Sequence, residues 1–429
     1  MKQPMQQMRL AALPLTLSLA LAMASGGAAA QAGQDAEGFH GYLRVGGGTF
    51  TGGDRGPQGC YGLGGNTHKY RLGNECDSDF EGGYTKEIAE SDGVRYVATL
   101  WVIAYGNKSG FRDAEFDILK GYVEAKGLDF LHGGTAWIGK RYYNRPDIHM
   151  MDFQYINFSG TGAGLDKIQA GPGKFSYAFF KDNDINILAA NGAVIGTTSA
   201  TRQNLMYQDL PVNAGGTVDV AASIITAQGG ETAGPRHNGW QLSAFHKQAD
   251  VLGGANNFGV QYGVGPGTGI GGDHGGMGSS GSTLLGSDVT RARVFDNLWI
   301  QPTWNFGVEM VALVQKDKSD AVGSSTWTSL GVRPVYALTK NLKLVMELGT
   351  DRVTSPTGGA AQRLTKVTFA PTISAGPGLW ARPELRAFVT YGKWNDAATA
   401  AVNAANSGGP VYNNRTSGTS VGFQVETWF

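Results

Sequence analysis

Hydrophobic and polar residues alternate along several segments of the chain, the pattern of a β-strand with one apolar and one polar face. The C-terminal segment is the clearest case. Its apolar face carries Val421, Phe423, Val425, Thr427 and Phe429. Its opposite face carries Gly422, Gln424, Glu426 and Trp428. In a soluble sandwich the apolar face would meet a core, whereas in an outer-membrane barrel it would meet lipid and the polar face would line water.

The same alternation recurs in four other segments, at 39–45, 257–262, 342–348 and 380–389. In the last of these, Trp380, Arg382, Glu384 and Arg386 share the polar face. One such segment is weak evidence, but five with the same logic predict an all-β protein, a transmembrane antiparallel β-barrel.

The predicted strands are joined by connections of two kinds. Residues 338–341 form a short one, whereas Gly265–Gly286 and Ala397–Gly418 are long and rich in glycine. Short periplasmic turns at one end and long external loops at the other are typical of outer-membrane barrels. The alternative is a soluble β-protein with inserted loops.

Composition narrows the class further. Glycine supplies 66 of 429 residues, charged residues are 16% and the formal net charge is zero. Such a chain is too rich in glycine for a helix bundle and has no basic surplus for a nucleic-acid backbone. After residue 32 no apolar stretch is long enough for a helical span, which excludes a helical membrane protein.

The N-terminus has the features of a secretory signal peptide. Lys2 and Arg9 precede an apolar run from Leu10 to Met23, and small residues follow it. We expect residues 1–32 to be the signal peptide, with cleavage after Ala30 or Ala32, and residues 33–429 to form a single barrel. The expected location is the outer membrane of a Gram-negative bacterium.

The chain has two cysteines, Cys60 and Cys76, flanked by glycines. In an oxidising compartment a disulfide that closes one loop is favoured over two free thiols.

Three aromatic residues, Tyr42, Trp380 and Trp428, lie where the alternation expects polar side chains. A large apolar surface in a water-filled lumen needs a reason, and a sugar ring supplies one. Its C–H face can stack on an aromatic ring while charged groups bond its hydroxyls. The alternative is that the three belong to the outward girdles of the barrel. Alternation favours the lumen for Tyr42 and Trp380 and does not decide for Trp428.

Motifs of enzymes and metal sites are not recognisable in the sequence. His149 with Asp147 and Asp152 could form a metal or acid–base cluster, but a polar loop network is the favoured interpretation. We therefore expect neither a catalytic activity nor a cofactor.

Several segments of the sequence resemble the maltoporins. They are Phe39–Arg44, Lys69–Cys76, Trp137–Ile168, Gly331–Pro334, Trp380–Pro383 and Glu426–Phe429. The resemblance covers essentially the whole mature chain and implies a homotrimer of eighteen-stranded barrels, each with its third loop folded into the pore.

The resemblance also implies the roles of individual residues. The aromatic slide that guides the sugar would comprise Tyr42, Trp380, Trp428 and, as a candidate that reaches into the neighbouring barrel, Phe111. The polar track and constriction would comprise Arg44, Arg71, Glu81, Arg145, Asp147, Asp152 and Gln154. Cys60 and Cys76 match a first-loop disulfide.

The chain departs from the family pattern at three positions. Asp79 and Ala255 stand where the family has aromatic residues, although Phe80 is adjacent to Asp79, and Gln154 replaces a tyrosine at the constriction. If each lost stack removes about 1 kcal/mol of sugar binding, the slide is weaker than the pattern implies.

The resulting hypothesis is facilitated diffusion of maltose and maltodextrins, with passage of ions and small solutes. The first alternative is a broader or general diffusion porin with little maltodextrin preference. A barrel enzyme would need a nucleophile or acid pair beside a histidine, and a role as a phage or colicin receptor leaves no mark in the sequence.

Overall fold

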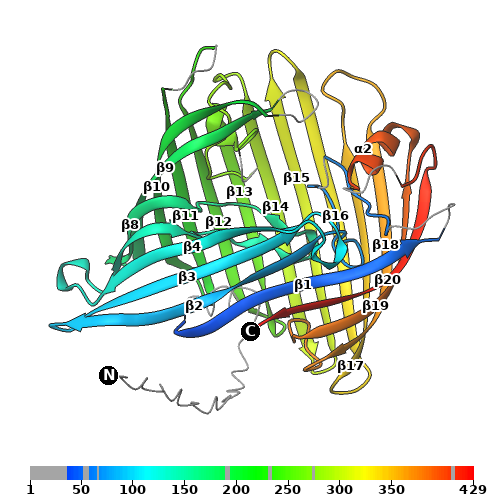
Figure 1. Ribbon diagram of the computed structural model, residues 1–429, viewed down its shortest axis with the longest axis horizontal. Coiled ribbons are helices and arrows are strands. Elements are labelled where there is room, and N and C mark those ends of the chain that lie inside the picture. The colour runs from blue at the N-terminus through cyan, green and yellow to red at the C-terminus, as the bar shows by residue number, and fades with distance from the viewer. Residues whose placement is uncertain are drawn as a thin grey trace, which may run out of the picture.

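The computed structural model describes residues 36–51, 58–64, 67–188, 194–229, 234–272, 276–406 and 411–429. Eighteen antiparallel strands of this part form one closed barrel, since the last strand pairs with the first (Figure 1). Closure leaves no unpaired sheet edge, as a barrel in lipid requires. The predicted eighteen-stranded antiparallel barrel is therefore confirmed. The predicted signal peptide lies outside the described residues.

The barrel strands follow one another around the wall in chain order. They are β1 (Gly38–Phe50), β2 (Ser78–Ser91), β3 (Val94–Gly106), β4 (Glu115–Lys126), β5 (Thr135–Arg141), β8 (Gly160–Ala170), β9 (Gly173–Leu188), β10 (Val194–Asn213), β11 (Gly216–Gln228), β12 (Gly239–Val251), β13 (Gly254–Val264), β14 (Thr290–Thr303), β15 (Phe306–Ser319), β16 (Gly323–Ala337), β17 (Leu342–Val353), β18 (Gln362–Ser374), β19 (Glu384–Trp394) and β20 (Ser417–Trp428).

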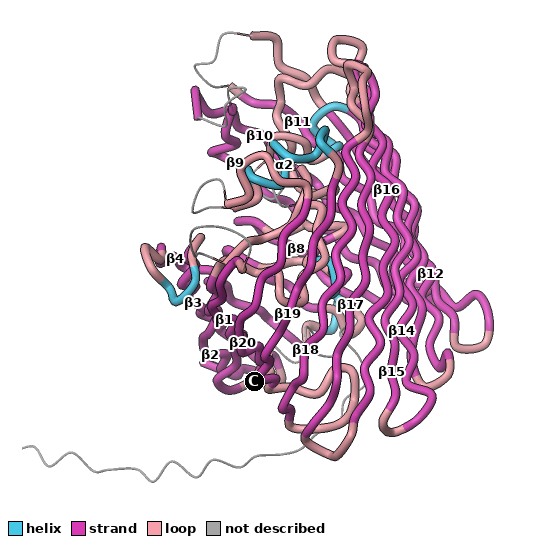
Figure 2. Tube along the Cα trace, turned by 90° about the vertical axis from the view of Figure 1, so that its right-hand side faces the viewer, coloured by secondary structure: helices cyan, strands magenta, loops and turns pink. Residues whose placement is uncertain are grey.

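Connections at the two ends of the barrel differ in length, as predicted (Figure 2). The long ones span 51–77, 142–159, 265–289 and 395–416, and the last contains helix α2 (Thr399–Ala404). At the other end, 92–93, 171–172, 214–215, 252–253, 304–305 and 338–341 are tight turns. The end with the long loops is the external one. In the described part of the chain no helix is long and apolar enough to cross a membrane.

Side chains alternate between the outside and the lumen as the sequence predicted. On β20, Phe423 is 68% exposed, whereas its neighbour Gln424 is 5% exposed. The predicted strand at 380–389 was wrong in its extent. Strand β19 begins at Glu384, so Trp380 and Arg382 lie in the preceding turn and not on the strand. A turn residue escapes the period-two rule, because the rule assumes extended backbone.

The first long loop folds back into the barrel and is fixed there. Its two cysteines form the predicted disulfide between Cys60 and Cys76. The ring of Tyr70 packs flat on the inner wall at a glycine pair, Gly331 opposite Gly349. A Cβ on either glycine would come within 2.0 Å of that ring, so only glycine permits this close approach.

Candidate functional site

The third external loop, residues 142–159, lies across the lumen and is bonded to the far wall. It contains a short ribbon, β6 (Asp147–Ile148) with β7 (Phe153–Gln154), around a turn at His149–Met151. The amide of Met150 donates to Glu309 of β15 at 3.4 Å. The carbonyl of Tyr155 accepts from Gln261 at 3.0 Å and Arg293 at 2.8 Å. These bonds explain why the loop stays in the lumen and narrows it.

Beside this loop a buried carboxylate, Glu426 of β20, organises three arginines. Arg71 of the first loop lies 2.9 Å from it, Arg382 lies 3.0 Å from it, and Arg386 of β19 also pairs with it. Glu426 is 0% exposed, so its charge depends on these partners. Sequence reasoning placed Glu426 on the lumenal face but did not assign it a role.

Arg44 of β1 extends the same network toward the third loop. It lies 3.0 Å from Glu75, 3.0 Å from Asp77 and 3.4 Å from Asp152. Burial opposes ionisation of Asp152, but Arg71, Arg44 and neighbouring cations outweigh it and hold its pKa well below the usual range. Arg44 and Arg71 are each only 4% exposed, whereas Asp152 remains exposed. Of these three predicted track residues, Asp152 is therefore the one open to a solute.

The predicted slide residue Tyr42 belongs to this network through its hydroxyl, which receives a bond from Arg71 at 2.7 Å and donates to Glu426 at 3.1 Å. Trp428 is the cross-strand partner of Tyr42, and partners in a sheet share a face, so both rings face the lumen. The guanidinium of Arg382 lies 4.4 Å from the centre of a Trp428 ring. Cation–π contact of this kind fixes the indole in place.

Three further rings continue the aromatic surface. His149 of the third loop lies edge-on to Trp428 at 6.0 Å and to Trp380 at 5.3 Å. Trp380 in turn lies 6.0 Å from Trp299 of β14. We call Tyr42, Trp428, Trp380 and Trp299 the aromatic row.

Trp299 was missed at the sequence level. It is the cross-strand partner of Ala255, one of the three departures, so an indole stands beside the position that lacks an aromatic ring. The signal was only partial. Arg291, Arg293, Asn297 and Trp299 share one face and Val294, Leu298 and Ile300 the other, but Phe295 and Asp296 interrupt the alternation.

A second group lies toward the external ends of β2 and β3. The hydroxyl of Tyr142 donates to Glu81 at 3.0 Å, and the Arg145 guanidinium lies 3.3 Å from the centre of the Tyr142 ring. Asp79 is the cross-strand partner of Tyr105, whose hydroxyl donates to Asp77 at 3.2 Å.

Four positions from the sequence analysis remain, namely Phe80, Asp147, Gln154 and Phe111. Phe80 pairs with Leu43 on the outward face, so it does not replace an aromatic at Asp79. Asp147 and Gln154 are partners in the ribbon of the third loop. Phe111 lies in the connection between β3 and β4, in a turn at Ser109–Phe111, and makes no ring contact with the aromatic row within the described residues.

No group of three or more histidine, cysteine or acidic side chains in the described ranges could hold a metal ion. The aromatic row and the ion-pair network thus lie side by side in the lumen, next to the third loop.

A closed barrel narrowed by an inward loop and lined by paired charges defines an outer-membrane channel protein. The family model of the LamB porin matches residues 38–429, and the chain belongs to that family. It is a porin of the outer membrane of a Gram-negative bacterium.

Several solved structures are similar to this chain over most of its length, at low sequence identity. OccAB2 of Acinetobacter baumannii is 12% identical, with coverage of 92% of this chain and 100% of that one and a TM-score of 0.48. OprD of Pseudomonas aeruginosa is 9% identical, with coverage of 91% and 92% and a TM-score of 0.48. Wzi of Escherichia coli, described as a carbohydrate-binding β-barrel, is 10% identical, with coverage of 92% and 85% and a TM-score of 0.46.

Proposed function

We propose that the barrel mediates facilitated diffusion of maltose and maltodextrins, and also passes ions and small solutes. The observation that carries this proposal is the aromatic row beside the inward third loop. Indole and phenol rings can stack on the apolar faces of successive glucose units, and Asp152 can accept hydrogen bonds from their hydroxyls. Conduction requires each contact to be favourable but weak, which suits single stacked rings.

In this proposal the polar residues of the track divide into two kinds. Asp152, with Arg145, Asp147 and Gln154, contacts the sugar from the third loop. Arg44, Arg71 and Glu81 act as positioning residues, since they are buried and hold the tyrosine hydroxyls and loop carboxylates in place.

The proposal extends to assembly and processing. We infer a homotrimer from membership of the LamB porin family, with Phe111 as a candidate contact to the neighbouring barrel. We further propose that residues 1–32 are removed as a signal peptide and that 33–429 form the mature, single-domain barrel.

The test is conductance across planar bilayers during titration with maltotriose. We expect concentration-dependent block of the ion current and weaker block for Trp380→Ala. Trp304→Ala is the matched control, since Trp304 lies in a turn and is 62% exposed. Conductance that maltotriose does not change would refute the maltodextrin assignment and favour a general diffusion porin.

A further inference from the structure

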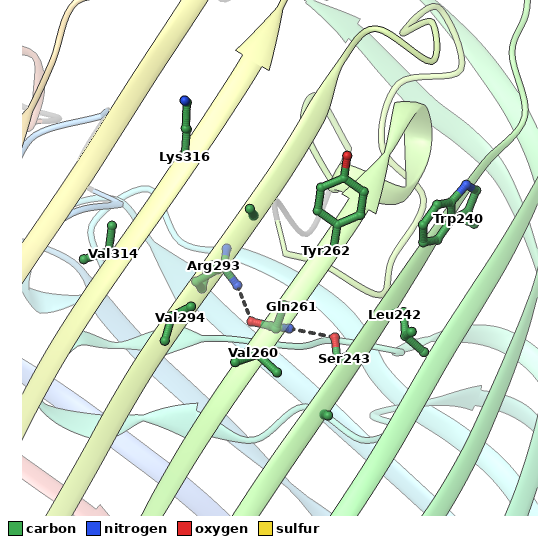
Figure 3. A pocket seen from close by; sticks show the side chains of 12 residues that line it. Trp240, Leu242, Ser243, Val260, Gln261, Tyr262, Arg293, Val294, Val314 and Lys316 are labelled. Carbon is green, nitrogen blue, oxygen red and sulfur yellow. Dashed lines mark hydrogen bonds between the residues drawn. The ribbon is translucent and has the colours of Figure 1, made fainter.

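The outer surface of the barrel carries a groove over β12–β15, near the external end (Figure 3). Its walls are outward-facing apolar side chains, namely Leu242, Val260, Val294 and Val314. The groove exists because Ala244 and Ala292, at outward positions between these larger residues, fill little space.

The groove is separate from the channel. On the lumenal side of the same strands, Arg293 donates to Gln261 at 2.9 Å, and Gln261 donates to Ser243 at 3.1 Å. Figure 3 shows this chain of hydrogen bonds crossing the strands behind the groove. A solute in the lumen therefore has no path into the groove through this wall.

Three polar tips stand at the external end of the groove. Figure 3 shows the ammonium of Lys316, the hydroxyl of Tyr262 and the indole nitrogen of Trp240 directed the same way, above the apolar walls. The rings of Trp240 and Tyr262 lie 5.8 Å apart. Ala292 of β14 is the cross-strand partner of Tyr262 on β13 and of Lys316 on β15. The tyrosine and the lysine therefore flank the alanine on either side.

Lys316 makes no ion pair within the described part of the chain. The next lysine on the same face of β15, Lys318, differs, since it lies 3.3 Å from Asp320. Asp296 shares the outward face of β14 but lies four residues farther from the external end than Ala292, and it accepts a bond from Asn256 at 2.8 Å. Among the described residues, the polar end of the groove thus has donors and a positive charge, and no acid pairs with Lys316.

We propose that this groove binds one phosphorylated lipid of the outer leaflet. An acyl chain lies against the apolar walls, and the phosphate accepts hydrogen bonds from Lys316, Tyr262 and Trp240. Size favours a lipid over a protein partner, because the groove is about 460 Å³. Small-molecule pockets span ~300–1,000 Å³, whereas a stable protein interface buries about 800 Å² on each partner.

The probes are diphosphorylated lipid A and the same lipid without its phosphates, added to delipidated protein in a non-ionic detergent. Binding is followed by native mass spectrometry. We expect Lys316→Gln to weaken binding of the phosphorylated probe about tenfold, the scale of a lost charge-assisted hydrogen bond. The same variant should bind the dephosphorylated probe as the wild type does.

Two further variants sharpen the test. Lys318→Gln is the matched control and should change binding less than twofold, since its partner is Asp320. Ala292→Trp fills the groove and should weaken binding of both probes. Unchanged channel conductance verifies that each variant is folded.

Equal binding by the wild type, Lys316→Gln and Ala292→Trp would overturn the proposal. Equal losses in Lys316→Gln and Lys318→Gln would overturn it too, since they would indicate attraction to any surface cation. A change in oligomeric state of Ala292→Trp without a change in lipid binding would assign the groove to a second copy of the chain instead.

Discussion

The two sides of the constriction present different side-chain chemistry to the lumen. Toward the periplasmic ends of the strands, Trp299, Trp380 and Trp428 present indole rings with His149 between two of them. Toward the external ends of β2 and β3, the rings are phenols whose hydroxyls are bound to acids. Tyr105 donates to Asp77 and Tyr142 donates to Glu81.

This difference indicates how one lumen can both admit and retain a polar solute. In the proposed function, a sugar that enters from outside meets acidic hydrogen-bond acceptors first and stacking surfaces second. Water competes well for the first kind of contact and poorly for the second. We therefore expect sugar affinity to reside on the indole side and entry to depend on the acidic side.

The largest expected effect is a loss of stability when the ion-pair network beside the indole rings is broken. Glu426→Gln removes the charge that Arg71, Arg382 and Arg386 share. Each of these buried arginines then keeps a single carboxylate, which is Glu75 for Arg71 and Glu384 for the other two. Loss of one partner of a buried ion pair costs about 3–5 kcal/mol. Urea unfolding of the detergent-solubilised barrel, followed by tryptophan fluorescence, measures this cost.

The control for that experiment is Glu37→Gln, because Glu37 is exposed and pairs only with Arg95 in the described structure. We expect less than about 1 kcal/mol for it. Equal losses in the two variants would show that the network around Glu426 has no special role.

The next largest expected effect is the loss of sugar affinity when two indole rings are removed. The double variant Trp299→Ala with Trp380→Ala should weaken maltotriose block about 30-fold, since each stack contributes ~1 kcal/mol. The two single variants and the double variant form a double-mutant cycle, in which multichannel conductance measures the block by maltotriose. If Trp299→Ala alone has no effect on block, Trp299 does not belong to the aromatic row.

A gain of function tests the acidic side. Asp79→Tyr places a ring beside Tyr105, its cross-strand partner, and should tighten maltotriose binding about fivefold. Asp79→Asn is the matched control, because it removes the charge without adding a ring. Tighter binding in both variants would mean that the negative charge, and not the missing ring, limits affinity.

The smallest effect is a dependence on pH. Burial, reinforced by the nearby charge of Asp152, raises the pKa of Asp147 to about 6. Asp147 is therefore mostly neutral at pH 5 and negative at pH 7.5, so the lumen gains negative charge as pH rises. Burial lowers the pKa of His149 to about 3, so His149 stays neutral over this range.

We accordingly expect the cation-to-anion permeability ratio to rise modestly from pH 5 to pH 7.5. Reversal potentials in a salt gradient measure it, and Asp147→Asn should flatten the rise. An Asp147→Asn channel with the wild-type pH profile would show that another group titrates.

Much of the fold followed from alternation, because lipid outside and water inside impose a period of two on every strand. The outward positions of Phe258, Val260 and Tyr262 were predicted correctly for this reason. The start of β19 was not, because Trp380 sits in a turn where alternation has no meaning.

Fewer contacts of the candidate site could be predicted from the sequence. Tyr42, Trp380 and Trp428 could be selected as aromatics at polar positions. The contact of Trp299 with Trp380 joins residues about 80 positions apart, and only the folded turn before β19 brings them together. Similarly, alternation places Glu426 in the lumen but does not reveal that the first loop delivers Arg71 to it.

The most direct test of the account is a structure of the protein soaked with maltotriose, in which the positions of the glucose rings are measured. The account predicts rings stacked against Trp428, Trp380 and Trp299, with hydroxyls near Asp152. Rings found only beside Tyr105 and Tyr142, or none in the lumen at saturating maltotriose, would contradict it.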